Sequence, residues 1–249
     1  MAGLGNIYRT MQEAKHKREA RFAVLVDPDK ASDRQLAAIA QQSAAAGADY
    51  IFVGGSLVMA ERMAHCLEAL RHACALPLVI FPGSPLQINH AADALLFLSL
   101  VSGRNPDLLI GQQVISAPYL HRSPLEIIGT AYLLIDGGVP TTVSYMSHTN
   151  PIPANKPDIA LATALAGEML GMRTIYLDAG SGALRPVSEA MIGALSREIS
   201  LPLIVGGGIR TPALAQAAAR AGANVIVVGN ALEKEPALLA EMAAAIKIG

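Results

Sequence analysis

Glycine-rich segments that could bind a phosphate group recur in the second half of the chain. Residues 206–208 (Gly-Gly-Gly), 229–230 (Gly-Asn) and 180–182 (Gly-Ser-Gly) each follow a short apolar run. Glycine leaves backbone N–H groups unshielded, and a helix that begins beside them, as expected over 211–221, points its positive end at the same place. Glycines can also serve only to turn the chain. Three such segments together favour a phosphate site.

Acidic and hydroxyl side chains follow other apolar runs. Asp27 and Asp29 come after the run 22–26, where a carboxylate could bind Mg²⁺ or act as a base, although Asp-Pro-Asp alone is more typical of a turn. Asp178 comes just before the glycines at 180–182, where a negative charge requires a hydroxyl or a metal as partner, so it is the stronger catalytic candidate. Ser56 could offer an oxygen to a metal or a phosphate, although a helix N-cap is its more ordinary role.

The histidines and cysteines are not spaced for a transition-metal site. The six histidines show neither HxH nor HxxxH spacing, and the chain has no CxxC, so a bound metal is expected to be a hard cation. His148, in the irregular segment 136–156, is the one histidine expected near a site. Cys66 and Cys74 would lie about 12 Å apart along one helix, expected over 57–74, too far for a disulfide. Free thiols are typical of a reducing compartment.

The order of apolar runs determines where these side chains must lie. Eight runs read as short strands, separated by segments that read as helices, and each strand ends in a loop with Gly, Pro, Asp or Ser. An open doubly wound sheet would also alternate in this way, but eight strands favour the α/β class with a closed (β/α)8 TIM barrel. We expect a single domain over 1–249, with a leading helix within 1–20. The expected strands cover residues 22–26, 50–53, 78–81, 94–98, 126–135, 174–177, 201–205 and 225–228.

Composition and charge exclude several classes of protein. Apolar residues make up 52% of the 249 residues and charged residues 16%, so the chain can bury a large core and is not disordered. A formal net charge of -1 provides no field for nucleic acid, which is not an expected partner. No apolar run reaches the roughly 18 residues that a membrane span needs. The start lacks the pattern of a secretory signal, and a cytoplasmic location is expected.

Two stretches of the chain carry almost no charge. Asp93 is the one charged residue in 72–103, and Asp136 is the one charged residue in 127–155. Such stretches could be buried at a subunit interface, or could form a groove for a long hydrocarbon substrate. The two interpretations are compatible with each other.

Seven motifs taken together resemble those of geranylgeranylglyceryl phosphate synthases, in particular the bacterial branch. The resemblance extends from the first expected strand to the last expected helix, and it is specific as a series because phosphate loops alone recur in many barrels. The motifs are VDPDK (26–30), VGGSL (53–57), FPGSPLQI (81–88), IIGTAYLLIDGGVPTTVSYMSHTNPIP (127–153), YLDAGSGA (176–183), VGGGIRTP (205–212) and VVGNALE (227–233).

The resemblance implies a Mg²⁺-dependent prenyltransferase of ether-lipid biosynthesis. It would join the primary hydroxyl of sn-glycerol 1-phosphate to C1 of a polyprenyl diphosphate, with geranylgeranyl diphosphate favoured, and release diphosphate. By motif, Asp27 and Ser56 match the metal positions, and Asp178 would orient or deprotonate the hydroxyl. The positions that match glycerol phosphate contacts are Tyr176, Leu177, Asp178, Ala179, Gly180, Ser181, Gly182, Gly207, Gly208, Gly229 and Asn230.

The chain departs from archaeal members of that family at two positions. Leu25 stands where they have a basic residue, and Asp178 stands where they have a glutamate. A DDxxD motif is absent, so prenyl chain elongation is not expected. Assembly into a homo-oligomer is expected from the family.

Two other functions remain open from the sequence. One is a phosphate-binding barrel isomerase or lyase of tryptophan or histidine biosynthesis, which needs a lysine, cysteine or acid pair at the strand ends; Lys30 is the one lysine near the expected mouth. The other is a barrel that senses a phosphorylated metabolite without catalysis. Release of diphosphate that depends on Mg²⁺ would distinguish the prenyltransferase from both.

Overall fold

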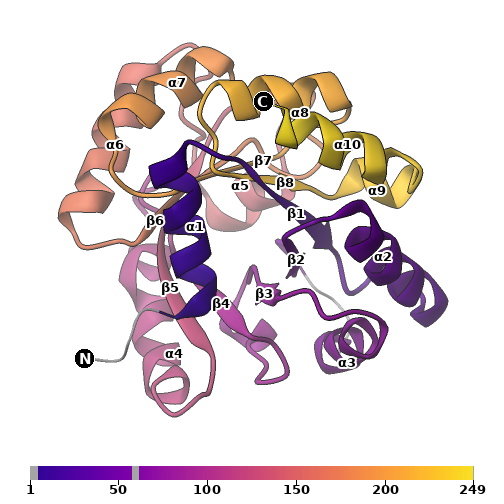
Figure 1. Cartoon of the computed structure of the whole chain (residues 1–249). Helices are drawn as coiled ribbons and strands as arrows, with labels where there is room; N and C mark the ends of the chain where they lie inside the picture. The colour runs from indigo at the N-terminus through magenta and orange to yellow at the C-terminus, as the bar shows by residue number, and fades with distance from the viewer. Residues whose placement is uncertain (1–4, 58–61, 249) are drawn as a thin grey trace.

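The computed structural model describes residues 5–57 and 62–248, and in it eight parallel strands close into a barrel (Figure 1). Each strand pairs with the next in sequence, and β8 pairs with β1. The predicted TIM barrel is therefore confirmed, and all eight expected strands are present. The strands are β1 (Arg21–Val26), β2 (Tyr50–Val53), β3 (Leu78–Ile80), β4 (Ala94–Ser99), β5 (Glu126–Leu134), β6 (Thr174–Asp178), β7 (Leu203–Gly206) and β8 (Val225–Val228).

Helices form an outer layer around the strands, as Figure 1 shows. Local sequence sets several ends: the Gln35 side chain accepts from the N–H of Ser32 at 2.9 Å before α2, and Gly47 ends that helix in the left-handed conformation. The helices are α1 (Asn6–Lys17), α2 (Asp33–Ala46), α3 (Met63–Ala73), the π-helical turn η2 (Asp107–Gly111), α4 (Gln112–Leu120), α5 (Thr142–Ser147), α6 (Pro157–Met169), α7 (Glu189–Glu198), α8 (Pro212–Arg220), α9 (Asn230–Lys234) and α10 (Leu238–Lys247).

The alternation of strands and helices is interrupted between β3 and β4. The chain there makes the 3₁₀ turn η1 (Pro85–Gln87) in place of an α-helix. Pro82 and Pro85 lack N–H groups and cannot donate the hydrogen bonds of a helix interior. The outer layer is consequently thin over β3 and β4.

Two other expected boundaries differ from the structure. The helix expected from Leu57 begins at Met63; Leu57 itself is not helical, and the interval 58–61 lies outside the described residues. The segment 136–156, expected to be irregular, contains the short helix α5. Its N-cap, Thr141, accepts a hydrogen bond from the N–H of Ser144, a local signal that explains the helix.

The end of the barrel formed by the amino ends of the strands is closed by α1. Ile7, Tyr8 and Met11 of this helix are buried in the same apolar cluster as the inward-facing side chains of the strands. The Glu126 carboxylate accepts hydrogen bonds from the N–H groups of Ile7 and Tyr8, both at 2.9 Å. The Arg173 guanidinium lies over the Tyr8 ring, 3.9 Å from its centre. A ligand can therefore reach the interior only from the opposite end.

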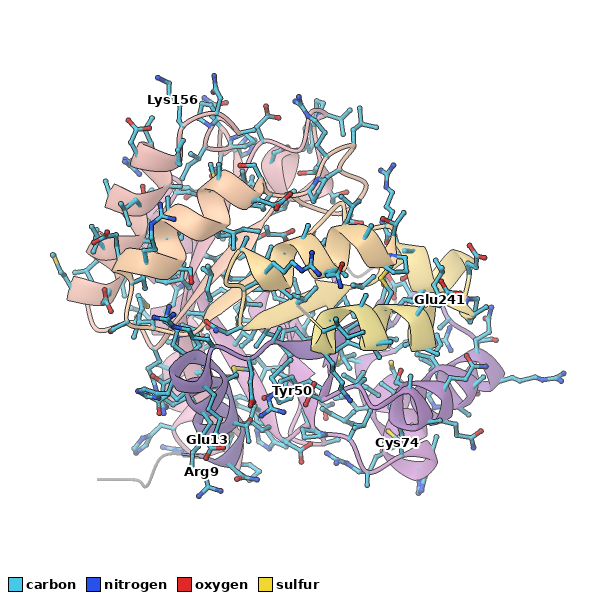
Figure 2. All side chains as sticks on the ribbon, turned by 45° about the horizontal axis from the view of Figure 1, so that its top comes forward. Arg9, Glu13, Tyr50, Cys74, Lys156 and Glu241 are labelled. Atoms are coloured by element: carbon cyan, nitrogen blue, oxygen red, sulfur yellow. The ribbon has the colours of Figure 1, made fainter. Side chains whose placement is uncertain are left out.

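The side chains follow the division between core and surface. Arg9 and Glu13 point away from α1 into solvent, whereas Tyr50 is buried inside the barrel (Figure 2). Cys66 and Cys74 are free thiols, in agreement with the sequence prediction. Within residues 5–57 and 62–248, none of the helices has the length and apolar character to span a membrane.

Candidate active site

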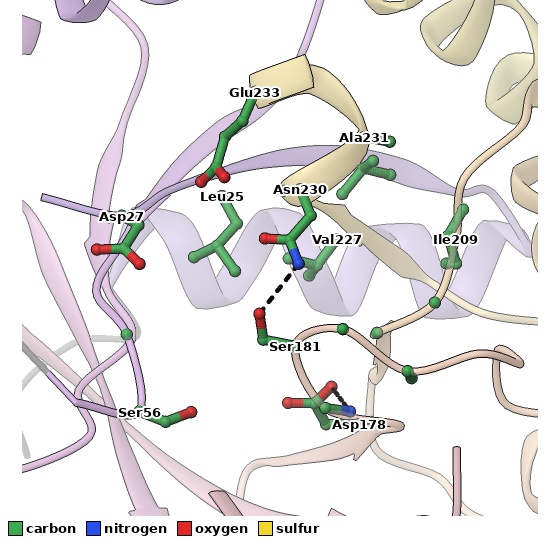
Figure 3. A pocket seen from close by; sticks show the side chains of 18 of the residues that line it. Leu25, Asp27, Ser56, Asp178, Ser181, Ile209, Val227, Asn230, Ala231 and Glu233 are labelled. Atoms are coloured by element: carbon green, nitrogen blue, oxygen red, sulfur yellow. Dashed lines mark hydrogen bonds between the residues drawn. The ribbon is translucent and has the colours of Figure 1, made fainter. Parts of the chain in front are cut away.

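A cavity of about 640 Å³ lies at the carboxyl ends of the strands (Figure 3). The loops after β1, β2, β6, β7 and β8 all contribute to its wall, which brings together most of the residues that the sequence selected. Tyr176 also lines it from the barrel interior. The residues of its wall at and beyond these strand ends include Asp27, Lys30, Gly54, Gly55, Ser56, Asp178, Gly180, Ser181, Gly182, Gly207, Gly208, Arg210, Gly229, Asn230 and Glu233.

The glycine loops after β6, β7 and β8 are packed against one another. A side chain at Gly207 would place its Cβ atom 2.6 Å from both Asp178 Oδ1 and the backbone nitrogen of Gly180, so this position requires glycine. The amide of Asn230 donates to Ser181 Oγ at 3.1 Å, which joins the β8 and β6 loops (Figure 3). The result is a glycine-lined pocket, a type of site that can bind an anion through backbone N–H groups.

Leu177 and Ala179, by contrast, are buried and do not line the cavity. They belong to the YLDAGSGA motif, and Leu177 packs in the outer core between the strands and the helices. Their contribution is to place Tyr176 and Asp178, whose side chains point to the other face of the strand.

Asp178 is a buried carboxylate with two hydrogen-bond donors. Oδ2 accepts from the Tyr132 hydroxyl at 2.6 Å, and Oδ1 accepts from the N–H of Gly180 at 2.7 Å. Burial raises the pKa of Asp178 above its ordinary value, and the two hydrogen bonds oppose that rise. A carboxylate with a raised pKa is a stronger base, which suits it to accept a proton from a hydroxyl.

Asp27 and Ser56 lie on one side of the same cavity (Figure 3). Asp27 Oδ1 accepts from the N–H of Asp29 at 3.1 Å, so this aspartate also forms the local turn that was its alternative role. Ser56 does not cap α3, whose N-cap is Arg62. A carboxylate and a hydroxyl are hard oxygen donors, which fit Mg²⁺. In the described part of the chain, no group of three or more His, Cys, Asp or Glu could hold a metal ion, so further ligands would come from substrate and water.

Two charged side chains that the sequence analysis did not select, Arg210 and Glu233, lie in the cavity wall together with Lys30. Lys30 Nζ lies 3.1 Å from Asp27 Oδ2 and 3.6 Å from Glu233 Oε2. Burial alone would lower the pKa of Lys30, but the two carboxylates outweigh it and raise the pKa, so the ammonium stays charged. Arg210 is the second cation of the wall, and its guanidinium donates to the carbonyl of Ala183. Arg210 lies in the motif VGGGIRTP and Glu233 in the motif VVGNALE. Membership of these motifs was the feature of the sequence that could have identified them as site residues.

A second cavity, of about 490 Å³, opens where the helix between β3 and β4 is missing. It shares Gly55, Ser56, Leu57 and Phe81 with the first cavity, so the two adjoin. Most of its wall comes from the two stretches of low charge, which supports the groove reading of those stretches. The apolar side chains of its wall include Leu86, Ile88, Leu95, Leu96, Leu98, Leu100, Leu108, Val143 and Met146.

His148, the histidine expected near the mouth, is exposed and lines neither cavity. Tyr132 was not selected from the sequence, although its hydroxyl contacts Asp178 and its side chain lines the second cavity. Its position inside an apolar strand gave no sign of this contact.

The barrel and its glycine loops define a phosphate-binding TIM barrel with an adjoining apolar groove. Residues 15–247 match the PcrB family, and the chain belongs to that family. Geranylgeranylglyceryl phosphate synthase of Chitinophaga pinensis is 53% identical over 240 residues, covering 96% of this chain and 95% of the relative. The enzyme of the same name from Spirosoma linguale is 50% identical, with 91% of each chain covered. The resemblance stated from the motifs is thereby confirmed.

Solved structures agree with this assignment. (S)-3-O-geranylgeranylglyceryl phosphate synthase of Thermoplasma acidophilum, in complex with sn-glycerol-1-phosphate, superposes with a TM-score of 0.92 at 34% identity, covering 98% of this chain and 99% of that one. Tryptophan synthase of Mycobacterium tuberculosis superposes with a TM-score of 0.62 at 16% identity, which shows a shared barrel fold alone.

Proposed function

We propose that this protein transfers a prenyl group from a polyprenyl diphosphate, with geranylgeranyl diphosphate favoured, to sn-glycerol 1-phosphate. The observation that carries the proposal is that two cavities adjoin at Ser56 and Phe81, one lined by glycine loops and the other apolar. An acceptor phosphate fits the first and a hydrocarbon tail fits the second. The names of the relatives, and the ligand of the Thermoplasma acidophilum structure, support the same pair of substrates.

The acceptor is held by the β6, β7 and β8 loops. Its phosphate binds to backbone N–H groups around Gly182, Gly207 and Gly208, and Asn230 and Ser181 offer polar side chains beside it. Arg210 adds a positive charge on this side of the cavity. The glycerol hydroxyl is then directed toward Asp178.

Asp27 and Ser56 would hold Mg²⁺ in the polar cavity, and Ser56 also lines the apolar one. When bound, the ion neutralises charge on the diphosphate leaving group. Lys30 contacts Oδ2 of Asp27 and lines the same cavity, so its ammonium is placed to contact diphosphate oxygens as well. The cavity wall has more carboxylates than cations, which disfavours an anionic donor. Lys30 and a bound metal ion would offset this negative charge.

Asp178 accepts the proton during transfer. The hydroxyl oxygen of the acceptor forms a bond to C1 of the donor, the bond between C1 and the diphosphate oxygen breaks, and diphosphate leaves with the electron pair. The hydroxyl proton goes to Asp178, whose pKa is raised by burial. Water is kept from C1 by the apolar wall around Phe81.

The test is a substrate matrix with the purified protein. Each enantiomer of glycerol phosphate is incubated with Mg²⁺ and with geranyl, farnesyl, geranylgeranyl or heptaprenyl diphosphate, and the ether products are identified by mass spectrometry. We expect product from the sn-1 enantiomer and the largest kcat/KM with the geranylgeranyl donor, because each buried methylene contributes about 0.8 kcal/mol. Omission of Mg²⁺ serves as the control. No ether with any donor, or preference for the sn-3 enantiomer, would refute the proposed function; a heptaprenyl preference would refute only the tail length.

A further inference from the structure

Tyr132 connects the two cavities through a single side chain. Its ring lines the apolar cavity, and its hydroxyl donates to Oδ2 of Asp178, which lines the polar cavity, at 2.6 Å. Both side chains are buried. The contact therefore lies between the tail of one proposed substrate and the hydroxyl of the other.

We propose that Tyr132 is a positioning residue for the reaction, which fixes the Asp178 carboxylate from the side of the apolar cavity. The proposal rests on the proposed role of Asp178 as proton acceptor. It assigns Tyr132 a role that depends on its hydroxyl and is separate from any contact of its ring with the prenyl tail.

The barrel register makes this contact. Tyr132 pairs with Tyr176 and Leu134 pairs with Asp178 across β5 and β6, so the Tyr132 hydroxyl reaches diagonally to the residue two positions along the neighbouring strand. Side chains two residues apart share one face of a strand, here the inside of the barrel. The contact is consequently built into the sheet and not into a loop.

The Tyr132 ring is itself held by other aromatic rings. Its centre lies 5.6 Å from that of Tyr176, edge to face, and 6.0 Å from that of Phe81. With Gly180 donating to Oδ1 and Tyr132 donating to Oδ2, each carboxylate oxygen has one fixed donor. The plane of the carboxylate is thereby set, and one further lone pair on each oxygen is left for a substrate hydroxyl.

The hydroxyl also affects the proton affinity of Asp178. A hydrogen bond to the charged form lowers the pKa of the carboxyl and opposes the rise that burial causes. The pKa of Tyr132 is raised well above its ordinary value, by burial and then by Asp178, so it remains a donor at working pH. Tyr176 also faces Asp178, β7 presents the uncharged Gly206 and Gly207 there, and the cations of the cavity wall are Lys30 and Arg210.

The Tyr132→Phe variant removes the hydroxyl and keeps the ring. We expect kcat to fall about tenfold or more, because a hydrogen bond to a charged group is lost, while KM for the prenyl diphosphate changes less than about twofold. Loss of the donor raises the pKa of Asp178 further. The acidic limb of the pH profile of kcat, where Asp178 becomes protonated, therefore moves to higher pH.

Tyr50→Phe is the matched control. Tyr50 is also a buried tyrosine inside the barrel, and its hydroxyl makes a hydrogen bond of 2.6 Å, but with Thr10 at the closed end. Tyr50→Phe therefore removes a tyrosine hydroxyl, as Tyr132→Phe does, but one that is bonded to Thr10 and not to Asp178. We expect normal kcat and an unmoved pH profile in this variant, with a loss of stability similar to that of Tyr132→Phe.

A direct readout separates this inference from the proposed function. The Asp178 carboxyl is titrated by ¹³C NMR in the free protein, with Asp178→Asn used to assign its signal. A raised pKa in Tyr132→Phe, together with the slower kcat, supports the proposal. An unchanged titration, or a pH profile like that of Tyr50→Phe, overturns it. Full activity of Asp178→Asn would instead refute Asp178 as the proton acceptor, whatever the titration of Tyr132→Phe shows.

Discussion

The two aspartates of the polar cavity, Asp27 and Asp178, differ in their contacts and therefore in the roles that suit them. Asp27 contacts Lys30 through Oδ2 and supports its own turn through Oδ1, whereas Asp178 is enclosed by Tyr132 and Gly180. The first carboxylate is reachable by a cation in the polar cavity, and the second is shielded from solvent. Two aspartates in one cavity are thus suited to different tasks, metal binding and proton transfer.

Replacement of Asp27 tests its proposed metal role. In Asp27→Asn one anionic oxygen ligand is lost, so we expect Mg²⁺ to bind about tenfold or more weakly in the presence of inorganic diphosphate, measured by calorimetry. kcat/KM at limiting Mg²⁺ should fall in parallel. Asp29→Asn is the control, because Asp29 lies in the same turn and does not line the cavity. Equal Mg²⁺ affinity in the wild type and Asp27→Asn would contradict the assignment.

The change from apolar to polar residues along the sequence indicated side chains at the ends of strands, whereas Tyr132, inside a strand, was not selected. Asp27, Ser56 and Asp178 follow apolar runs, where a change from apolar to polar residues indicates the end of a strand. Tyr132 lies within such a run, and its contact with Asp178 depends on the register between β5 and β6. Register across a closed barrel is set by the tilt of all strands together, which one strand's sequence does not reveal.

At the scale of elements, the loops after β6, β7 and β8 form one unit. Gly182 and Gly171 provide a matched pair for testing it, because both have positive φ, 83° and 86°, and a Cβ atom at either would meet no protein atom within 4 Å. Gly182 lines the cavity, whereas Gly171 follows the end of α6.

Substitution of these two glycines tests the phosphate pocket. Both alanine variants should lose about 1 kcal/mol of unfolding free energy from the left-handed backbone. We expect the affinity for glycerol phosphate, measured by calorimetry, to fall about tenfold in Gly182→Ala and to stay unchanged in Gly171→Ala. Equal affinities in the two variants would place the phosphate elsewhere.

The connection between β3 and β4 contains no α-helix, which shows that the alternation of strands and helices does not hold at every position in this barrel. The strands could be predicted because each is an apolar run bounded by turn residues. A strictly regular barrel would have a helix after β3 as well, but Pro82, Gly83 and Pro85 are poor helix formers and indicate a loop there. The short turn η1, which stands in place of a helix, leaves room for the apolar cavity. This cavity is the proposed binding site of the prenyl donor, so the irregular element of the barrel lies at a functional site.

At the scale of the whole molecule, the two ends of the barrel are separated in role. The carboxyl ends of the strands carry both cavities, and α1 closes the other end through the two hydrogen bonds to Glu126 and the contact of Arg173 with Tyr8. Stability and chemistry can therefore be changed independently. Assembly into a homo-oligomer stays a prediction.

Glu126→Ala tests this separation. The N–H groups of Ile7 and Tyr8 lose their acceptor at a partly buried helix start, so we expect the unfolding free energy to fall by about 1–2 kcal/mol, measured by urea denaturation. kcat/KM at a temperature where the variant is folded should remain that of the wild type. Glu13→Ala is the control: its pair with Arg9 is 3.9 Å long and exposed, and its loss should cost less than about 0.5 kcal/mol. A similar loss of unfolding free energy in the two variants would show that the hydrogen bonds of Glu126 do not stabilise the closed end. A fall in kcat/KM with Glu126→Ala would show that the closed end also affects catalysis.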